Sequence, residues 1–135
     1  VGFPGESDEE WQDSIKFIEE TLFSRIHIFT YSKREGTKAA SLSNQINATI
    51  KKERSRQLHA LAKSMRQTCL QEQLNKSHAV LWETRNEKNA WTGYTDNFIR
   101  VESKYAYDLN LENKISNIKI TDITTDASHC IAEII

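Results

Sequence analysis

Lysine and arginine residues that could bind an anionic partner are concentrated in the middle of this chain. Residues 32–66 hold nine bases and two acids, a net charge of +7, whereas residues 1–31 carry −5 and residues 67–135 carry −3. A basic segment between two acidic ones favours an anionic partner, although charged side chains more often form a solvated face. The candidate phosphate-binding residues are Lys33, Arg34, Lys38, Lys51, Lys52 and Arg54.

Aromatic residues alternate with polar ones near residues 91–101. Tyr94, Phe98 and Arg100 share one face if this stretch is a strand, because strand side chains alternate with period two; Trp91 precedes them in a turn. Exposed aromatic rings beside an arginine suit stacking on unpaired RNA bases, at ~1–3 kcal/mol per base. Packing in a core is the alternative. We predict core packing for Phe98 and RNA contact for Trp91, Tyr94 and Arg100.

The thiol and imidazole groups do not form a metal-binding pattern. Cys69 and Cys130 are 61 residues apart, too far for a local metal knuckle, and two cysteines make no disulfide framework. They indicate reduced thiols in a cytoplasmic protein. His129 would point to the opposite face of a strand from Cys130, and His27 has no partner at ligand spacing. We predict no metal ligand, no catalytic residue and, since no apolar run reaches ~18 residues, no membrane segment.

The first 31 residues predict a β-α-β unit. Gly2 to Gly5 form a tight turn, after which Ser7 and Glu10 make a capping box that starts a helix. Val1 reads as the end of a strand, and Ile26–Tyr31 as the next strand. One such unit cannot cover its own sheet, so we expect more of the same polypeptide before Val1. The helix ends near Phe23, and its apolar face comprises Trp11, Ile15, Ile18 and Leu22.

The rest of the chain predicts a polar loop, a long basic helix over residues 47–73 with Asn47 as its N-cap, and a small β-barrel. We expect a domain boundary between residues 73 and 74, and a barrel domain over 74–135. The fold class is therefore α+β. The predicted strands are Ser77–Thr84, Tyr94–Val101, Ile115–Ile123 and Cys130–Ile135.

Four blocks of this sequence resemble the radical S-adenosylmethionine (SAM) methylthiotransferases. Residues 2–7, Gly-Phe-Pro-Gly-Glu-Ser, resemble the family's GFPGET turn, and residues 27–40 resemble its second block. Residues 45–54 are similar to the start of its basic connecting helix. Residues 92–101 look like the centre of a TRAM domain, a small β-barrel thought to bind RNA. The sequences of these motifs look most similar to the branch of the family that acts on threonylcarbamoyladenosine in tRNA. The branches that act on isopentenyladenosine or on an aspartate of a ribosomal protein are alternatives.

The resemblance implies the last β-α-β piece of a radical SAM (β/α) partial TIM barrel, a linking helix and an antiparallel TRAM barrel. The parent enzyme would add a methylthio group to a modified adenosine of tRNA next to the anticodon, using SAM and two [4Fe–4S] clusters. This chain lacks the family's cysteine triplet, so we expect it to be inactive alone. The residues implied near SAM are Gly2, Phe3, Gly5 and Tyr31; Tyr31 could instead pack beneath a helix.

Two other interpretations are a stand-alone TRAM-type RNA-binding module without catalysis and a structural domain without a ligand. The β-α-β unit argues against both, because a free module has no use for part of a barrel. The sequence also departs from the family pattern, with Asn75 and Asn113 near positions where glycine is expected. Asparagine tolerates a positive φ better than most residues, so these turns are expected to survive.

Overall fold

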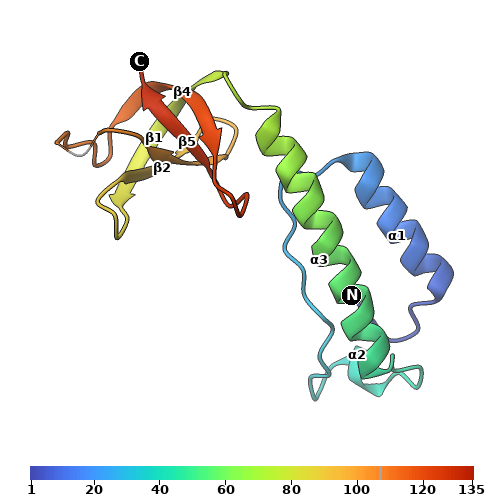
Figure 1. The fold of residues 1–135 in the computed structure, drawn as a ribbon. Helices are drawn as coiled ribbons and strands as arrows, with labels where there is room; N and C mark the ends of the chain where they lie inside the picture. Colours follow the sequence, from blue (N-terminus) through green and yellow to red (C-terminus); the bar gives the residue numbers. More distant parts are fainter. Residues whose placement is uncertain (107) are drawn as a thin grey trace. The chain divides into compact units, whose positions relative to one another are not determined.

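The computed structural model describes residues 1–106 and 108–135. The chain forms two compact units, Val1–Arg66 and Gln67–Ile135. Three helices, α1 (Asp8–Thr21), α2 (Lys38–Ser41) and α3 (Ala48–Gln71), precede five strands, β1 (Ser77–Arg85), β2 (Trp91–Thr95), β3 (Arg100–Ser103), β4 (Ile115–Ile123) and β5 (Cys130–Ile134) (Figure 1). The α+β class is confirmed. None of the described helices is both long and apolar enough to span a bilayer.

Helix α1 begins at the predicted capping box. Ser7 Oγ accepts the backbone N–H of Glu10 at 3.1 Å, and Glu10 Oε2 accepts the N–H of Ser7 at 2.8 Å. This reciprocal pair satisfies two N–H groups that the first turn would otherwise leave without a partner. The helix ends at Thr21, and Leu22 follows in the left-handed conformation with φ 53°.

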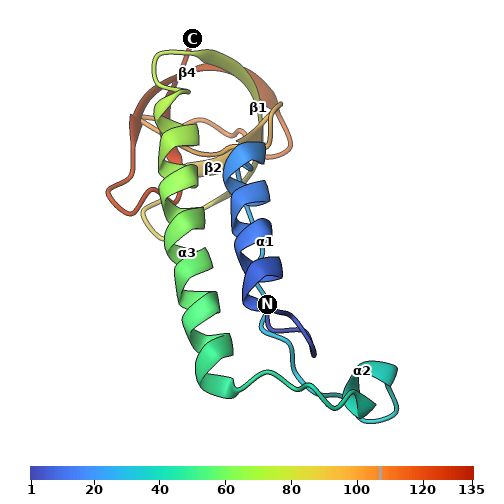
Figure 2. The same cartoon turned by 90° about the vertical axis from the view of Figure 1, so that its right-hand side faces the viewer.

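Helices α1 and α3 lie side by side in the first unit, as Figures 1 and 2 both show. Trp11 of α1 and Leu58 of α3 are buried, at 4% and 6% exposure. The Trp11 indole N–H donates to Gln57 Oε1 at 3.3 Å. The predicted apolar face of α1 is only partly used, because Ile15 and Ile18 are half-buried and Leu22 is exposed.

The predicted strand over Ile26–Tyr31 is extended chain rather than an assigned strand. The Val1 amino group donates to Phe29 O at 2.9 Å, and the Tyr31 N–H donates to Val1 O at 2.8 Å. Val1 is thus hydrogen-bonded to both neighbours of the residue opposite it. This is the pattern of a single bridge between two parallel strands. Among the described residues these two bonds are the pairing between the segments, so the partial barrel stays a prediction about the longer protein.

Helix α3 starts where expected. Asn47 Oδ1 accepts the N–H of Thr49 at 2.8 Å, which confirms Asn47 as its cap. The first compact unit ends at Arg66 and the second begins at Gln67, both inside α3. The reason is packing, since Leu70 in the last turn of α3 is completely buried in the core of the second unit.

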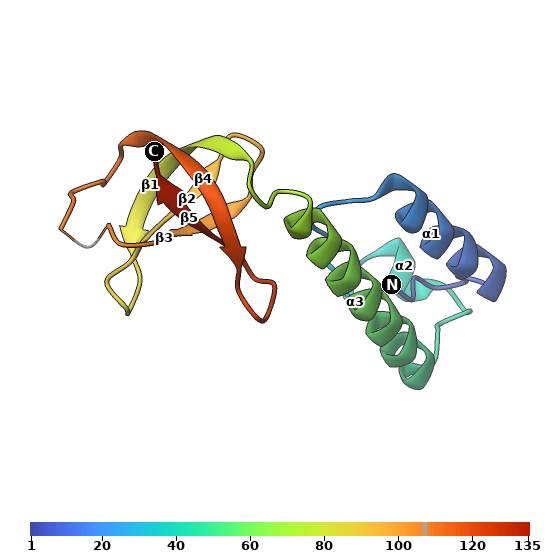
Figure 3. The same ribbon diagram turned by 45° about the horizontal axis from the view of Figure 1, so that its top comes forward.

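The second unit is a closed five-stranded barrel with strand order β1-β2-β3-β5-β4 (Figure 3). The prediction of an antiparallel barrel is wrong at one place, because β3 and β5 pair in parallel, with Val101 opposite Cys130. The predicted strand Tyr94–Val101 is also wrong. It is divided by a turn in which Phe98 has φ 61°, so β2 ends at Thr95 and β3 starts at Arg100.

The barrel interior is filled by alternate strand residues, as expected for a small barrel. Trp82 is fully buried, and its indole N–H donates to Ser116 Oγ at 2.9 Å. Gly93 allows close strand approach, since a Cβ there would overlap with the carbonyl oxygen of Leu81. Asn75 and Asn113 adopt φ of 64° and 56°, which confirms that asparagine supports these turns. The other large side chains that are fully buried among the described residues are Leu70, Val80, Val101, Ile118, Ile120 and Cys130.

Candidate functional site

The turn formed by residues 2–7 has two glycines in the left-handed region. Gly2 has φ +76° and Gly5 has φ +90°, conformations that L side chains rarely adopt. The Gly2 N–H donates to Glu6 Oε2 at 2.8 Å, and the Gly5 N–H donates to Asn44 O at 2.7 Å. The turn is thus tied both to its own carboxylate and to the loop before α3.

Arg54 of α3 is the main support of this turn. Its Nη1 donates to Glu6 Oε2 at 2.6 Å and to Glu6 O at 3.2 Å, and its Nη2 donates to Asp8 Oδ1 at 2.7 Å and to Ser7 O at 3.3 Å. Burial lowers the pKa of Arg54, but the hydrogen bonds that it donates to the Asp8 and Glu6 carboxylates outweigh this effect and raise the pKa above its usual value. We predicted a phosphate contact for Arg54; at 5% exposure it is instead occupied by carboxylate and carbonyl oxygens.

Lys51 also faces the turn rather than solvent. Its methylene groups lie against Gly2, where a Cβ would overlap with Lys51 Cγ. Its ammonium group donates to Tyr31 O at 3.2 Å and lies 5.8 Å from the Tyr31 ring centroid. Helical periodicity explains this orientation, because residues 51, 54 and 58 lie on the face of α3 that packs inward.

Three of the four residues expected near SAM lie together. Phe3 packs edge-on against Tyr31, with ring centroids 5.6 Å apart. Tyr31 Oη is buried and has no hydrogen-bond partner among the described residues, and buried hydroxyls normally have one. Gly2 adjoins the pair through Lys51. Gly5 lies at the edge of a shallow hollow lined by Phe3, Pro4, Gly5, Glu6 and Glu10, with open space beside its Cα.

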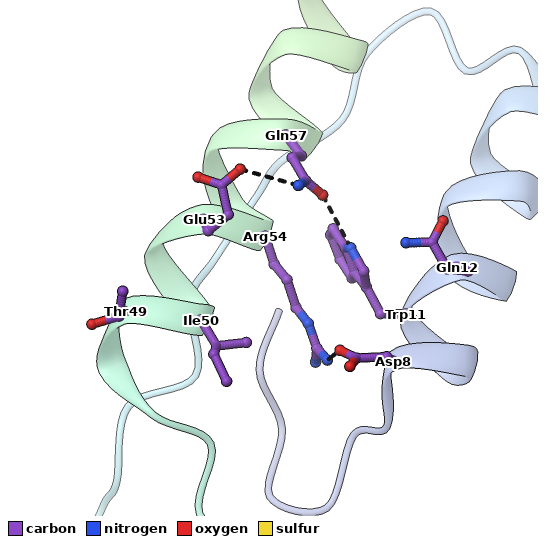
Figure 4. Close-up of a pocket in the computed structure, with 8 residues that line it drawn as sticks. All are labelled: Asp8, Trp11, Gln12, Thr49, Ile50, Glu53, Arg54 and Gln57. Carbon is purple, nitrogen blue, oxygen red and sulfur yellow. Dashed lines mark hydrogen bonds and ion pairs between the residues drawn. The ribbon is translucent and has the colours of Figure 1, made fainter.

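A second hollow, not predicted from the sequence, lies between α1 and α3 (Figure 4). It encloses about 360 Å³. Gln57 links its two walls, accepting from Trp11 and donating to Glu53 Oε1 at 3.1 Å. The Arg56 guanidinium holds the pKa of the Glu53 carboxyl below its ordinary value. The eight lining residues are Asp8, Trp11, Gln12, Thr49, Ile50, Glu53, Arg54 and Gln57.

Other predicted phosphate-binding residues are exposed to solvent. Lys33 and Arg34 lie in the polar loop, Lys38 starts α2, and Lys52 is on α3. All four are accessible to a partner, in contrast to Lys51 and Arg54.

In the barrel, Trp91 is not the exposed residue that we predicted. It is the first residue of β2 and is only 5% exposed. Its indole N–H donates to Leu109 O at 2.7 Å, and the Arg85 guanidinium lies 4.7 Å from its ring centroid. Trp91 therefore belongs to the core, where its polar N–H has found a partner.

Tyr94 and Arg100 are directly opposite each other on β2 and β3. Tyr94 is half-buried and Arg100 is exposed. The prediction of core packing for Phe98 is wrong, because this residue is 87% exposed at the tip of the β2–β3 turn. The prediction failed because it treated Tyr94 and Phe98 as parts of one strand. A turn begins between them, so the alternation of side chains along a strand no longer relates their directions. The Thr95–Asp96–Asn97 sequence before Phe98 was the signal that could have revealed it.

Comparison with known proteins places these blocks in a family. The chain is 36% identical over 124 residues, 89% of its length, to threonylcarbamoyladenosine tRNA methylthiotransferase MtaB of Bacillus subtilis, covering 27% of that protein. It is 34% identical over 93% of its length to the tRNA-2-methylthio-N(6)-dimethylallyladenosine synthase of Alkaliphilus oremlandii, covering 26% of it. This chain belongs to the radical SAM methylthiotransferase family.

The methylthiotransferase similarity extends to a third branch. The ribosomal protein uS12 methylthiotransferase RimO of Alkaliphilus oremlandii is 38% identical over 64% of this chain, and the match covers 20% of RimO. No family model matches the chain. The chain spans about a quarter of the length of the curated methylthiotransferases it matches.

The iron–sulfur clusters associated with this family do not fit the residues of this chain. A cluster needs several cysteine thiolates, and the chain has two cysteines. Cys130 is buried in the barrel core and Cys69 packs against the same core. The described residues contain no group of three or more His, Cys, Asp or Glu side chains placed to hold a metal.

Proposed function

We propose that this chain is the C-terminal part of a tRNA methylthiotransferase, which adds a methylthio group to a modified adenosine beside the anticodon. The observation that carries the proposal is the similarity to MtaB over 89% of the chain. We propose N(6)-threonylcarbamoyladenosine as the nucleoside because MtaB is named for it. A stand-alone RNA-binding module is less well supported, since the relatives carry this segment within much longer chains.

In this proposal, residues 1–7 and Tyr31 form part of a SAM site. The fit rests on Tyr31 Oη, a buried hydroxyl without a partner among the described residues, and on the open space at Gly5. Gly2 and Gly5 would let the backbone approach the ligand, Phe3 would offer an aromatic edge, and Tyr31 would hydrogen-bond a polar group. When bound, SAM supplies the radical and the methyl group. The residues of this chain bind and orient it.

The second proposed role of the chain is binding of tRNA. Lys33, Arg34 and Lys52 are exposed bases that can neutralise phosphates. Tyr94 and Arg100 offer a ring and a guanidinium on neighbouring barrel strands, which suits stacking on an unpaired base. We also propose a cytoplasmic location, where tRNA is modified and where Cys69 and Cys130 would remain thiols.

The test is fluorescence anisotropy of labelled tRNA with the protein at two salt concentrations. We expect salt-sensitive binding that weakens several-fold in Tyr94→Ala and Arg100→Ala, because each removes a contact to RNA. Lys76→Ala, an exposed base of the turn before β1, is the control for loss of one positive charge. A folded protein that fails to bind tRNA at low salt would contradict this part of the proposal.

The SAM site is tested separately by calorimetric titration of SAM into the protein. Tyr31→Phe keeps the ring packing on Phe3 and removes only the hydroxyl. We expect weaker SAM binding in Tyr31→Phe with an unchanged thermal transition. Equal SAM affinity in both proteins would exclude Tyr31 Oη as a ligand contact.

A further inference from the structure

Helix α3 has a stripe of basic side chains on the face opposite to its packed face. Lys52, Arg56, His59 and Lys63, here called the basic stripe, are all exposed. They are separated by four, three and four residues, so they lie above one another within about 40° of one line at 3.6 residues per turn. The stripe contains no acidic residue and extends over about 16 Å of helix at 1.5 Å per residue.

The opposite face of α3 is already occupied. Arg54 is buried against the turn at residues 2–7, and Leu58 is buried at 6% exposure. Leu61 and Met65 continue this face and are half-buried. The helix thus separates its bases by orientation, since Arg54 is neutralised by the carboxylates of Glu6 and Asp8 whereas the basic stripe faces solvent.

Within the described part of the chain, Lys52 and Lys63 make no ion pair with a carboxylate. Arg56 pairs with Glu53 at 2.6 Å, but the side chains are 71% and 48% exposed. Exposed pairs of this kind contribute only ~0–1 kcal/mol, so a phosphate can replace Glu53 at little cost. His59 Nδ1 lies 2.9 Å from Ser55 O, and the His59 side chain is exposed.

We propose that the basic stripe is a binding surface for the phosphate backbone of RNA, contacting successive phosphates along the helix without reading sequence. The proposal rests on the tRNA-binding function above and assigns part of it to α3. Three permanent positive charges at helical spacing suit a polyanion whose duplex form carries a phosphate about every 3.4 Å per strand. Lys52 is the residue of the stripe that was also named above as a candidate phosphate contact.

A membrane surface fits the basic stripe less well than RNA does. Helices that lie on membranes bury an exposed apolar face beside their basic residues. On α3 the apolar residues lie on the face away from the stripe, where Leu58 is buried and Leu61 and Met65 are half-buried. The stripe is flanked by Ser55 and Ala60, which supply little apolar area.

The experiment compares two charge-matched triple variants of the protein in tRNA binding between 50 and 300 mM salt. The stripe variant is Lys52→Gln, Arg56→Gln and Lys63→Gln. The control variant, Lys16→Gln, Lys88→Gln and Lys119→Gln, removes three exposed bases from α1, the β1–β2 turn and β4. Circular dichroism and the thermal transition establish that both variants fold, as expected for exposed positions.

We expect the stripe variant to bind tRNA about tenfold or more weakly at moderate salt, and the slope of log affinity against log salt to fall by about 2, since each lost phosphate contact changes it by ~0.7–0.9. A homopolymeric RNA should show the same loss. The control variant should keep most of the affinity and a slope within about 1 of the unchanged protein.

Equal affinities and slopes for the stripe and control variants would overturn the proposal that the basic stripe binds RNA. The proposal that the protein binds tRNA would still stand. An unchanged protein that binds no tRNA at low salt would overturn both proposals. Anionic phospholipid vesicles supply the remaining outcome. Binding to vesicles that depends on the same three residues, with no preference for RNA, would contradict RNA as the partner.

Discussion

Glu6 Oε2 accepts the N–H of Gly2 at 2.8 Å and the Nη1–H of Arg54 at 2.6 Å. One carboxylate oxygen therefore joins the N-terminal turn to a helix 48 residues further along the chain. The pair is largely shielded, with side-chain exposures of 6% for Arg54 and 18% for Glu6. It sets the position of the turn that is proposed to contact SAM.

Replacement of Arg54 by glutamine should loosen this turn. The change leaves the partly buried Glu6 carboxylate without its cation. We expect the free energy of unfolding to fall by about 2–3 kcal/mol. This is less than the ~3–5 kcal/mol expected for a fully buried pair, because Glu6 keeps some contact with water. Hydrogen exchange at the Gly2 and Gly5 amides measures it. Arg56→Gln, which breaks an exposed pair, should cost under ~1 kcal/mol. Equal effects of the two variants would contradict a supporting role for Arg54.

Gly2 and Gly5 should respond differently to alanine. Alanine in the left-handed backbone conformation costs about 1–2 kcal/mol at either position. Only at Gly2 would the new Cβ also overlap with Lys51. Gly2→Ala should therefore destabilise the first unit more than Gly5→Ala in thermal unfolding. In a Lys51→Ala background the difference should shrink, because the overlapping methylenes are gone. A difference that persists without the Lys51 side chain would point to another cause.

Trp91→Phe should affect stability rather than RNA binding. The change removes the indole hydrogen bond to Leu109 O and shrinks the ring beneath Arg85, while Leu109 O keeps the Arg85 Nη2–H as a donor. We therefore expect the free energy of unfolding to fall by about 0.5–1.5 kcal/mol, the net worth of one hydrogen bond. Urea unfolding measures the loss, and tRNA anisotropy should be unchanged at temperatures where the variant is folded. Weaker tRNA binding with unchanged stability would instead support a direct contact between Trp91 and RNA.

Asp126 should contribute an acid-sensitive part of barrel stability. Hydrogen bonds from the Thr124 side chain and the Ser128 backbone lower its pKa from 3.8 to about 2. Because the folded pKa is below the unfolded one, this stabilisation is present above about pH 4 and is lost as the pH falls towards 2. Asp126→Asn should flatten the pH dependence of urea unfolding in this window, and Thr124→Val should flatten it partly. Unchanged pH dependence in Asp126→Asn would contradict the assignment.

Local sequence was sufficient for features held by neighbouring residues. The capping box at Ser7, the cap at Asn47, β4 at Ile115–Ile123 and the positive φ of Asn75 and Asn113 all depend on contacts within a few residues or on backbone preference. The family resemblance was also available from the sequence, because its motifs are contiguous blocks.

Tertiary structure decided which side of each element faces the protein. The sequence gives no reason to separate three neighbouring basic residues, Lys51, Lys52 and Arg54. Packing against the turn at residues 2–7 nevertheless directs Lys51 and Arg54 inward and leaves Lys52 in solvent. Likewise, closure of the barrel buries Trp91, exposes Phe98 and pairs β3 with β5 in parallel. Such outcomes depend on contacts between residues far apart in the chain, and no local pattern encodes those contacts.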